Sequence, residues 1–376
     1  MSSTCSQIDS LLSHLSKYES NPKPEDDAKK SHLKSLQETK SKSTEEDDSK
    51  VPENWDNAAI ANETCTLRFS ECNTPYFGIW LDLEMILFKK QSEFQDVRII
   101  ETKQFGRQLI LDMKTQSAEK DEYLYHESLT HPAMLIHPCP KRVFIGGAGE
   151  LATARETLKY KSVERVVLCD LDKVVVDACI EFLPQMSRAA KADKRLEIII
   201  ADAKQTLEQS TETWDVVIMD IADPIEAGPG IACYFQSFYQ QIYDKLSDNG
   251  VFVTQSGPGG FVGHQECATT IYNTVKSVFP HTYLYTQEVP SYGQDWAFTI
   301  GIKLPKDKDI PAMKDWTFVD KEISKRFNGD STLIKNTFRH YDGQSHSGMF
   351  SLPKHIRNSL ENETRVMTKD TPVFMF

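Results

Sequence analysis

The sequence predicts an α/β protein in which a small β domain precedes a doubly wound parallel sheet. Two patterns predict this fold class. Between Cys65 and Gln116, apolar and polar residues alternate as they do in β-strands, and after Lys141 short apolar runs alternate with helical stretches. Strands and helices in alternation form βαβ units, and these build a parallel sheet that helices cover on both faces.

Residues 1–62 differ in composition from the rest and are predicted to be a disordered polar tail. Ser, Lys, Glu and Asp dominate there, the run Glu45–Asp48 is wholly acidic, and aromatic residues are nearly absent. Such a segment buries too little apolar surface to offset the entropy that it would lose on ordering. No function follows from this composition.

Residues 63–138 are predicted to form the N-terminal β domain. The strand-like segments Val97–Glu101 and Gln108–Asp112 flank the pair Phe105-Gly106. Glycine is typical of a turn there, because it adopts backbone conformations that other residues avoid. The two segments are therefore expected to pair as a hairpin.

Residues 139–305 are predicted to form the doubly wound catalytic domain. Its expected parallel strands are short apolar runs at Val143–Gly146, Val166–Cys169, Leu196–Ile200, Val216–Met219 and Val251–Thr254. The helical stretches between them include Leu151–Tyr160 and Lys173–Leu183. Two later segments, Thr282–Thr286 and Ala297–Ile302, are expected to add antiparallel strands at the edge of the sheet. Residues 306–376, which are charged and mixed, are expected to be a C-terminal extension.

Composition limits the function classes. The net charge of −12 argues against nucleic acid as a partner, because phosphate binding needs clustered Lys and Arg, and it favours cationic ligands. The eight cysteines contain no C-x-x-C pair, which is typical of a reducing compartment and predicts neither a disulfide framework nor a zinc site. No run approaches the roughly 18 apolar residues of a membrane span. We therefore expect a cytoplasmic protein with no membrane or nucleic-acid partner.

Two carboxylates follow the most apolar of the expected strands. Asp220 and Asp223 come directly after Val216–Met219, and Pro224 with Gly228-Pro229-Gly230 forces an irregular loop. Ligands of open α/β sheets bind at the carboxyl ends of the strands, where these acids are expected to lie. Two neighbouring carboxylates repel each other unless a cation lies between them, which a polyamine or a sulfonium supplies. The alternative is an aspartate that only caps the next helix.

A glycine-rich turn and further acids predict a nucleoside site beside this loop. The turn Gly146–Glu150 follows the first strand, Asp170 ends the second strand roughly 20 residues later, where an acid can bind ribose hydroxyls, and Asp202 ends the third. The acid Glu150 within the turn would repel a pyrophosphate, so a positively charged nucleoside such as an S-adenosyl sulfonium fits better than a dinucleotide. The alternative is a turn whose glycines serve packing alone.

The ordered set of these residues resembles one enzyme family. The set comprises Phe94-Gln95-Asp96, Leu111-Asp112, Gln116, Asp121-Glu122, Tyr125-His126-Glu127, Gly147–Glu150 with Arg155-Glu156, Asp170-Leu171-Asp172, Asp202 and Asp220-x-x-Asp223-Pro224. It is similar to the aminopropyltransferases, the spermidine and spermine synthase family. The resemblance spans roughly residues 75–305 and implies the Rossmann-like, methyltransferase-type sheet. It implies transfer of a 3-aminopropyl group from decarboxylated S-adenosylmethionine to a polyamine, with release of 5′-methylthioadenosine.

Departures from the family pattern point to its thermospermine synthase branch, which extends spermidine. The loop Asp220–Gly230 is longer by two residues than the usual Asp-Ser-Ser-Asp-Pro-x-Gly-Pro-Ala, and the usual Asp-Gly after the third strand is Asp202-Ala203. The segments Gln255–His264 and Val289–Trp296 also resemble that branch. Spermine synthase and spermidine synthase remain possible, because the nitrogen that is attacked depends on the depth of the acceptor channel.

The resemblance assigns roles residue by residue. On the donor side Gln95 contacts the nucleoside, Glu150 holds the aminopropyl ammonium, Asp170 binds the ribose, and Asp202 with the Ala203 backbone binds the adenine. Asp220 accepts the proton, and Asp223 orients the acceptor amine. The remaining substrate-binding residues, expected along the polyamine channel or its loop, are Tyr125, His126, Pro229 and Tyr292. The resemblance also implies a homodimer or a higher homo-oligomer.

The chemistry explains why carboxylates are needed. An alkylamine with a pKa near ~10.4 is mostly protonated at neutral pH, so a base must accept its proton before the lone pair attacks the carbon beside sulfur. The ten histidines are scattered along the sequence, and we expect no metal and no cofactor, the decarboxylated donor being a co-substrate. For His126, a packed or capping role competes with a place in the polyamine channel.

Two functions of other classes compete with aminopropyl transfer. An S-adenosylmethionine methyltransferase uses the same sheet and the same ribose acid, but its donor retains a carboxylate that Glu150 would repel. An inactive homologue that acts as an interaction protein would not need both Asp220 and Asp223, and the chain carries both. The sequence therefore favours the aminopropyltransferase.

Overall fold

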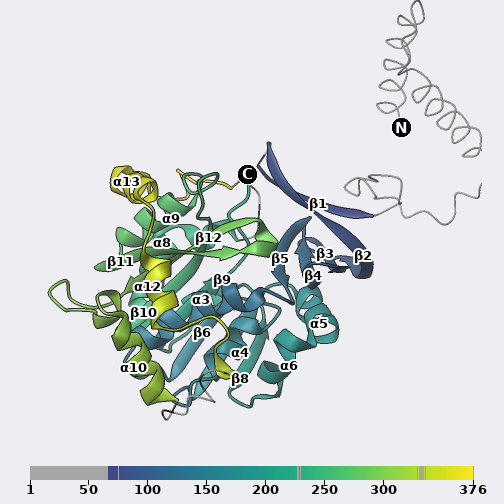
Figure 1. Ribbon diagram of the computed structural model, residues 1–376. Helices are drawn as coiled ribbons and strands as arrows, with labels where there is room; N and C mark the ends of the chain where they lie inside the picture. The colour runs from purple at the N-terminus through teal and green to yellow at the C-terminus, as the bar shows by residue number, and fades with distance from the viewer. Residues whose placement is uncertain are drawn as a thin grey trace, which may run out of the picture. The chain divides into compact units, whose positions relative to one another are not determined.

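The computed structural model describes residues 67–74, 76–226, 228, 230–327, 329, 334 and 336–375, and the predicted tail at 1–62 lies outside them. The described residues form a five-stranded antiparallel sheet and a seven-stranded mixed sheet with helices around it (Figure 1). The predicted fold class is confirmed. None of the helices within the described ranges is long and apolar enough to cross a membrane.

The five-stranded sheet is a simple meander. Its strands pair in chain order, and they are β1 (Arg68–Thr74), β2 (Phe77–Gln91), β3 (Asp96–Thr102), β4 (Gly106–Leu111) and β5 (Lys114–Ala118). The predicted hairpin is the pair β3–β4, in which Thr102 lies opposite Gly106. Gly106 has a φ of 71°, a left-handed conformation that explains the glycine at this turn.

The seven-stranded sheet has the order β11-β12-β10-β9-β6-β7-β8. Its strands are β6 (Arg142–Gly147), β7 (Arg165–Asp170), β8 (Leu196–Ile200), β9 (Trp214–Asp220), β10 (Leu246–Pro258), β11 (His281–Val289) and β12 (Gln294–Ile302). β12 runs antiparallel to β10 and to β11, as expected for the late edge strands, while the other pairs are parallel. From β6 the strand order continues to β7 and β8 on one side and to β9 and β10 on the other. The order therefore reverses at β6, and a ligand site is expected at the carboxyl ends of the strands there.

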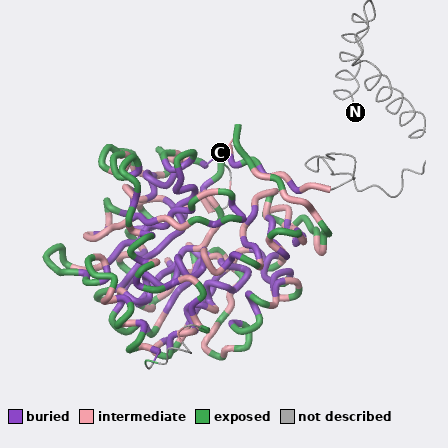
Figure 2. Tube along the Cα trace, viewed as in Figure 1, coloured by how far each residue is buried: buried purple, intermediate pink, exposed green. Residues whose placement is uncertain are grey.

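Helices cover both faces of the large sheet. They are α3 (Glu122–Ile136), α4 (Ala152–Leu158), α5 (Lys173–Phe182), α6 (Pro184–Ala192), α7 (Ala203–Gln209), α8 (Gln236–Lys245) and α9 (Ala268–Lys276). Alternate residues of β9 enter two different cores: Val216 and Ile218 pack with α3 and α4, whereas Val217 and Met219 pack with α7 and α8. The centre of the sheet is therefore buried on both faces, as Figure 2 shows by the colour of its strands.

The residues after 305 form α10 (Trp316–Arg326), α12 (Gly343–Phe350) and α13 (Lys354–Asn362). This C-terminal extension is bonded to α3. The Glu127 carboxylate accepts the backbone N–H groups of Arg339, His340 and Tyr341 at 2.8, 2.8 and 2.9 Å. The Arg326 guanidinium donates to backbone carbonyls at the end of α3, including that of Met134 at 2.6 Å. The domain boundaries at 62, 138 and 305 stay predictions, although α3, which precedes residue 138, packs on the larger sheet.

Candidate active site

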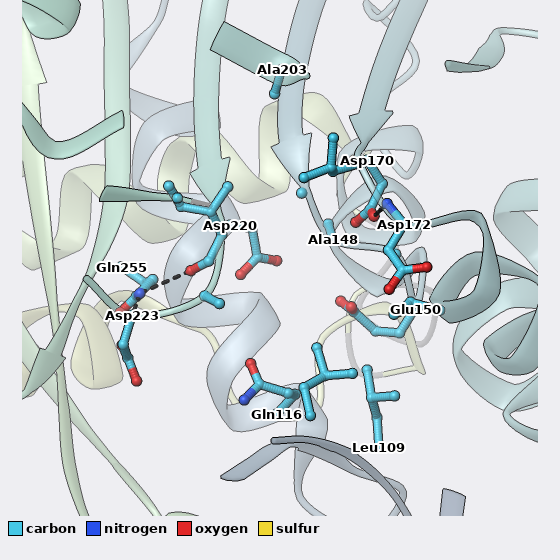
Figure 3. A pocket seen from close by; sticks show the side chains of 18 of the residues that line it. Leu109, Gln116, Ala148, Glu150, Asp170, Asp172, Ala203, Asp220, Asp223 and Gln255 are labelled. Carbon is cyan, nitrogen blue, oxygen red and sulfur yellow. Dashed lines mark hydrogen bonds between the residues drawn. The ribbon is translucent and has the colours of Figure 1, made fainter. Parts of the chain in front are cut away.

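A cavity of about 160 Å³ lies at the carboxyl ends of β6, β7 and β9 and is closed on its other side by residues of the five-stranded sheet. All the predicted site residues line it except Pro229, which lies outside the described residues. Figure 3 shows Asp220 in the middle, with Asp223 and Gln255 on one side and Glu150, Asp170 and Asp172 on the other. The site therefore has two halves, which we call the donor half (around Glu150 and Asp170) and the acceptor half (around Asp223).

The glycine-rich turn is locked to the strand that carries Asp220. Gly147 has a φ of 81°, and a Cβ atom there would lie 2.1 Å from the backbone oxygen of Asp220. Ala148, with a φ of 63°, donates its N–H to the same oxygen at 3.0 Å. Gly147 is thus required by close backbone approach, so the turn and the aspartate keep a fixed separation.

Asp170 lies at the end of β7 beside the turn. A Cβ atom on Gly149 would lie 3.0 Å from Asp170 Oδ2, so the glycine allows the carboxylate to approach the turn. Asp170 Oδ1 accepts the N–H of Asp172 at 2.8 Å. Burial, and then the negative charge of Glu150, raise the pKa of Asp170 to about 7. The carboxylate lines the cavity, where a hydroxyl of a ligand could donate to it.

Gln95 joins the small sheet to the donor half. Its amide nitrogen donates to Asp172 Oδ2 at 3.1 Å, and the Ser92 hydroxyl donates to the same oxygen at 2.6 Å. Asp172 caps α5 by accepting the N–H of Val174 at 2.9 Å. The loop between β2 and β3 is therefore fixed against the helix that follows Asp170.

Asp202 and Ala203 lie at the start of α7. Asp202 accepts the N–H of Gln205 through Oδ1 at 3.1 Å, which caps the helix, and the side chain is otherwise exposed at the rim of the cavity. Ala203 is buried and lies beneath the donor half. One oxygen of Asp202 is thus used in capping, and Oδ2 is left for a ligand.

Glu150 is the last of a row of acidic and basic side chains that are hydrogen-bonded to one another. Its Oε1 lies 2.9 Å from Nε2 of His126, whose Nδ1 lies 2.8 Å from Oε2 of Glu122. Glu122 in turn accepts from Arg155 at 2.8 Å. Burial alone would lower the pKa of His126, but the hydrogen bonds to Glu122 and Glu150 outweigh it and raise the pKa to about 10. The two carboxylates therefore favour the imidazolium form of His126.

These hydrogen bonds limit the contacts that His126 can make with a substrate. Both of its ring nitrogens are taken by carboxylates and the side chain is buried, so it offers no free polar atom to a polyamine. It lines the cavity and fixes Glu150 by a charged hydrogen bond. The contacts match a packed histidine more closely than a channel wall, and the predicted contact with substrate stays a prediction.

Asp220 is held between two hydroxyl groups. Tyr125 donates to Oδ1 at 2.6 Å and Thr153 donates to Oδ2 at 2.5 Å. Burial and the neighbouring charge of Glu150 raise its pKa above the ordinary value, while the charge of His126 and the two hydroxyl groups act against that rise. A carboxylate with a raised pKa and a fixed orientation is suited to accept a proton near neutral pH.

Asp223 is held by an amide. Gln255 on β10 donates to Asp223 Oδ1 at 3.0 Å, and its own oxygen accepts from the Trp296 indole at 3.1 Å and from Gly257 N at 2.8 Å. Burial raises the pKa of Asp223 to about 6. The interpretation in which these acids cap the next helix is wrong for the described helices, because η2 (Ile231–Tyr234) and α8 begin without a side-chain cap.

Aromatic rings also line the cavity. The rings of Tyr125 and Tyr292 meet edge to face with centroids 5.8 Å apart, and Tyr292 meets Trp296 at 4.8 Å. The Tyr292 hydroxyl donates to the backbone oxygen of Gln116 in the small sheet. An aromatic wall of this kind suits the methylene groups and the ammonium groups of a flexible cation.

Several functional candidates were not found from the sequence. Gln255 stood only within a segment that resembled the family branch, and Thr153 carried no signal. Glu71 on β1 is buried near Asp223, accepts Thr115 N–H at 2.9 Å and has a pKa raised first by burial. Its strand is about 150 residues away in sequence, and Glu71 shares the buried face of β1 with Phe69 and Asn73, which is a weak signal for a functional acid.

Two clusters within the described ranges have the spacing of metal ligands, His126–Glu150–Asp220 and Glu127–His131–Glu156. In the first, both ring nitrogens of His126 are already within hydrogen-bond distance of carboxylates. In the second, Glu127 accepts backbone N–H groups, while Glu156 is paired with Arg155 and Lys159. Both donor sets are satisfied by protein groups. The absence of a metal and of a cofactor stays a prediction.

Comparison with known proteins gives two family matches. Residues 122–309 match the spermine/spermidine synthase domain, and residues 67–119 match the spermidine synthase tetramerisation domain. A crystal structure of spermidine synthase in complex with the transition state analogue AdoDATO aligns with a TM-score of 0.68 at 30% identity, over 79% of this chain and 96% of that chain. Spermidine synthase from Thermotoga maritima aligns with a TM-score of 0.66 at 30% identity, over 79% and 95%.

Two relatives extend the match along the sequence. A thermospermine synthase of Arabidopsis thaliana is 42% identical over 294 residues, which cover 78% of this chain and 83% of the relative. A polyamine aminopropyltransferase of Aeropyrum pernix is 38% identical over 309 residues, which cover 82% and 95%. With the acids of both halves in one cavity, these matches show that the chain belongs to the spermidine and spermine synthase family of polyamine aminopropyltransferases.

Proposed function

We propose that this aminopropyltransferase uses spermidine as its acceptor and produces thermospermine and 5′-methylthioadenosine. The observation that carries the acceptor and product is the 42% identity to the Arabidopsis thermospermine synthase. The loop after β9 supports it, because Ile221 and Ala222 line the cavity between the two acids where spermidine synthases usually carry two serines. The donor is decarboxylated S-adenosylmethionine.

The proposed step is a direct displacement. The lone pair of a neutral acceptor amine attacks the donor carbon beside sulfur, so that a C–N bond forms while the C–S bond breaks. The C–S electron pair stays on sulfur, which becomes the neutral thioether of methylthioadenosine, and the amine proton passes to Asp220. Departure neutralises the sulfonium, so catalysis rests mainly on holding nitrogen, carbon and sulfur in line.

The proposed roles follow the two halves of the cavity. In the donor half, Asp170 accepts from the ribose hydroxyls, Glu150 pairs with the aminopropyl ammonium, Gln95 contacts the nucleoside, and Asp202 with Ala203 contacts the adenine. In the acceptor half, Asp223 orients the attacking amine, and Glu71 pairs with the next ammonium of the acceptor. The contact with His126 Nε2 keeps Glu150 Oε1 in a fixed position in the donor half.

We also propose a cytoplasmic homo-oligomer that forms through the five-stranded sheet. The match to the tetramerisation domain covers this sheet, and Trp80, Met85 and Ile86 of β2 are exposed there at 56%, 56% and 46%. Exposed apolar groups on a sheet are typical of a protein–protein interface. The scattered cysteines, which are free among the described residues, support a reducing compartment.

The test of the product is direct. The purified protein is incubated with spermidine and decarboxylated S-adenosylmethionine, and the tetraamine product is separated by chromatography against thermospermine and spermine standards. A product that elutes with thermospermine is expected. A product that elutes only with spermine, or a strong preference for putrescine over spermidine, would overturn the proposal in favour of spermine or spermidine synthase.

A further inference from the structure

A second cavity of about 20 Å³ adjoins the acceptor half. It shares four lining residues with the main cavity (Thr115, Asp223, Tyr292 and Trp296), so it continues the space beyond Asp223. The other residues around it are Glu71, Asn73, Lys114, Gln294 and Met375. A space of this size holds roughly one water molecule, or one ammonium group of similar size.

Two carboxylates, those of Glu71 and Asp223, line this second cavity with one ammonium, that of Lys114. The ammonium donates to the backbone oxygen of Cys72. The acids outnumber the cation, so the polar part favours a ligand cation that donates hydrogen bonds. Glu71 is buried, and burial followed by the charge of Asp223 raises its pKa. Asn73 Oδ1 is buried and has no hydrogen-bond partner among the described residues, while the Asn73 amide nitrogen donates to Tyr292 O at 3.0 Å. An unpartnered acceptor next to a carboxylate is costly when empty and is satisfied by an ammonium.

Met375 is the apolar wall of the second cavity. The side chain is 8% exposed. A Cβ atom on Gly257 would lie 3.4 Å from Met375 Sδ and 3.9 Å from Asp223 Oδ1, so the thioether and the carboxylate approach the same glycine. The thioether is therefore next to the acceptor half, at the place where the cavity ends.

The segment that carries Met375 is fixed to the rest of the site. Met375 N donates to the backbone oxygen of Pro224, in the loop that carries Asp223, at 2.8 Å. Further back, Met367 N donates to Thr274 Oγ1 at 2.9 Å, and Met367 O accepts from Gln236 N at 2.8 Å. Val373 and Met375 pack against the main core. Residues 367–375 thus bind α8, α9 and the catalytic loop, which keeps the Met375 side chain in place.

We propose that Met375 is a specificity-determining residue that ends the acceptor cavity and limits the length of the polyamine that fits. The inference rests on the proposed function, because it takes a linear polyamine as the ligand of the acceptor half. With Met375 in place, the terminal ammonium beyond Asp223 meets Glu71 and Asn73, and the chain cannot extend past them. Removal of the thioether opens this end to a longer chain.

The test compares three acceptors that differ in length: norspermidine, spermidine and spermine. In Met375→Ala, the ratio of kcat/KM for spermine to kcat/KM for norspermidine should rise about tenfold, the smallest effect expected when a pocket changes by at least one methylene. In Met375→Phe, which fills the space further, the ratio should fall. Phe374→Ala is the matched control, because Phe374 lies next to Met375 but does not line either cavity, and its ratio should equal that of the unmodified protein.

The outcomes separate this inference from the proposed function. Unmodified protein that transfers to no polyamine refutes the proposed function. If all three proteins transfer and the ratio of kcat/KM for spermine to kcat/KM for norspermidine is the same in Met375→Ala, Met375→Phe and the unmodified protein, the role of Met375 is overturned and the proposed function is not. Calorimetry with 5′-methylthioadenosine and thermal melting verify that each variant folds with an intact donor half. If Met375→Ala does not fold, Met375→Val replaces it because it also shortens the side chain, and an unchanged ratio in Met375→Val and Met375→Phe is the overturning result.

Discussion

Asp220 is the residue on which turnover should depend most strongly. Replacing Asp220 with Asn keeps its shape and its contact with Tyr125 but removes the basic oxygen. Turnover should fall roughly 10²–10⁴-fold, the range for loss of a general base, while affinity for the donor changes little. Steady-state kinetics with spermidine varied at saturating donor measures the first effect, and calorimetry with the donor measures the second.

Asp223→Asn is the matched comparison within the same loop. Its amide oxygen can still accept from Gln255, so the loop should keep its conformation. If Asp223 mainly orients the acceptor, the KM for spermidine should rise more than turnover falls. Near-normal turnover of Asp220→Asn over the whole pH range would move the role of the base to Asp223.

Glu150 should discriminate between donors. Its carboxylate favours the free ammonium of the decarboxylated donor and opposes the carboxylate that S-adenosylmethionine retains. Glu150→Gln should weaken binding of the decarboxylated donor by roughly 1–3 kcal/mol, the range for a hydrogen bond to a charged group. Binding of 5′-methylthioadenosine, which lacks the ammonium, is the control. Equal affinities for the decarboxylated donor in both proteins, measured by calorimetry, would show that Glu150 does not hold the ammonium.

Some residues of the site could be predicted from the sequence and others could not. Asp170, Asp202 and Asp220 follow apolar runs, so the ends of parallel strands predict where they meet. The pairing of His126 with two carboxylates depends on a helix that brings Glu122 one turn away and on a turn that brings Glu150 from another element. Neither contact leaves a pattern in the sequence.

At the scale of elements, α3 has two functional faces. Tyr125 and His126 face the cavity, whereas Glu127 and His131 face the C-terminal extension. Glu127→Gln keeps one acceptor oxygen for three backbone N–H groups and removes the charge. The free energy of unfolding should fall by about 1–3 kcal/mol, because a buried hydrogen-bonded network loses partners.

Chemical denaturation measures that loss, with Glu361→Gln as the control. Glu361 is an exposed acid on α13, and its replacement should change the free energy of unfolding by less than about 0.5 kcal/mol. Equal unfolding free energies for the two variants would mean that the bonds between Glu127 and residues 339–341 contribute no net stability.

The sequence predicted strands more readily than helices. The central parallel strands of the large sheet are buried on both faces and therefore form continuous apolar runs, as in β9, whereas the edge strand β8 is partly exposed. Helix α3 has no such signal. Its polar residues Glu122, His126, Glu127 and His131 are buried on several sides, so apolar and polar residues do not alternate with the helical period. The helices of the C-terminal extension could not be predicted for a similar reason, since few of their residues are apolar and buried.

At the scale of the whole molecule, the five-stranded sheet should mediate assembly. Met85→Glu places a charge on the exposed apolar surface of β2 and should shift the protein toward a smaller assembly. Light scattering coupled to size-exclusion chromatography measures the mass in solution. Phe261→Glu is the control, because Phe261 is 82% exposed but lies outside this sheet. The same mass for the Met85 variant and the unmodified protein would argue against an interface on β2.

The contacts that join the two sheets could not be predicted from sequence patterns. Asn73 donates to the backbone of Tyr292, and Ser291 N donates to Asp121 at 2.7 Å, although these pairs are far apart along the chain. Periodicity describes one element at a time, whereas such contacts depend on how elements meet. The sequence therefore predicted both halves of the site but neither the second cavity nor its wall.

The raised pKa of an acid in the cavity has a consequence for the solution around the protein. Burial raises the pKa of Asp223 to about 6, and the ammonium of the acceptor lowers it again because it favours the ionised carboxylate. Near pH 6, filling the cavity should therefore release protons. The heat of spermidine binding should differ between phosphate and a buffer with a larger ionisation enthalpy, by an amount proportional to the protons released. Identical heats in both buffers would mean that the carboxylate is already ionised before the substrate arrives.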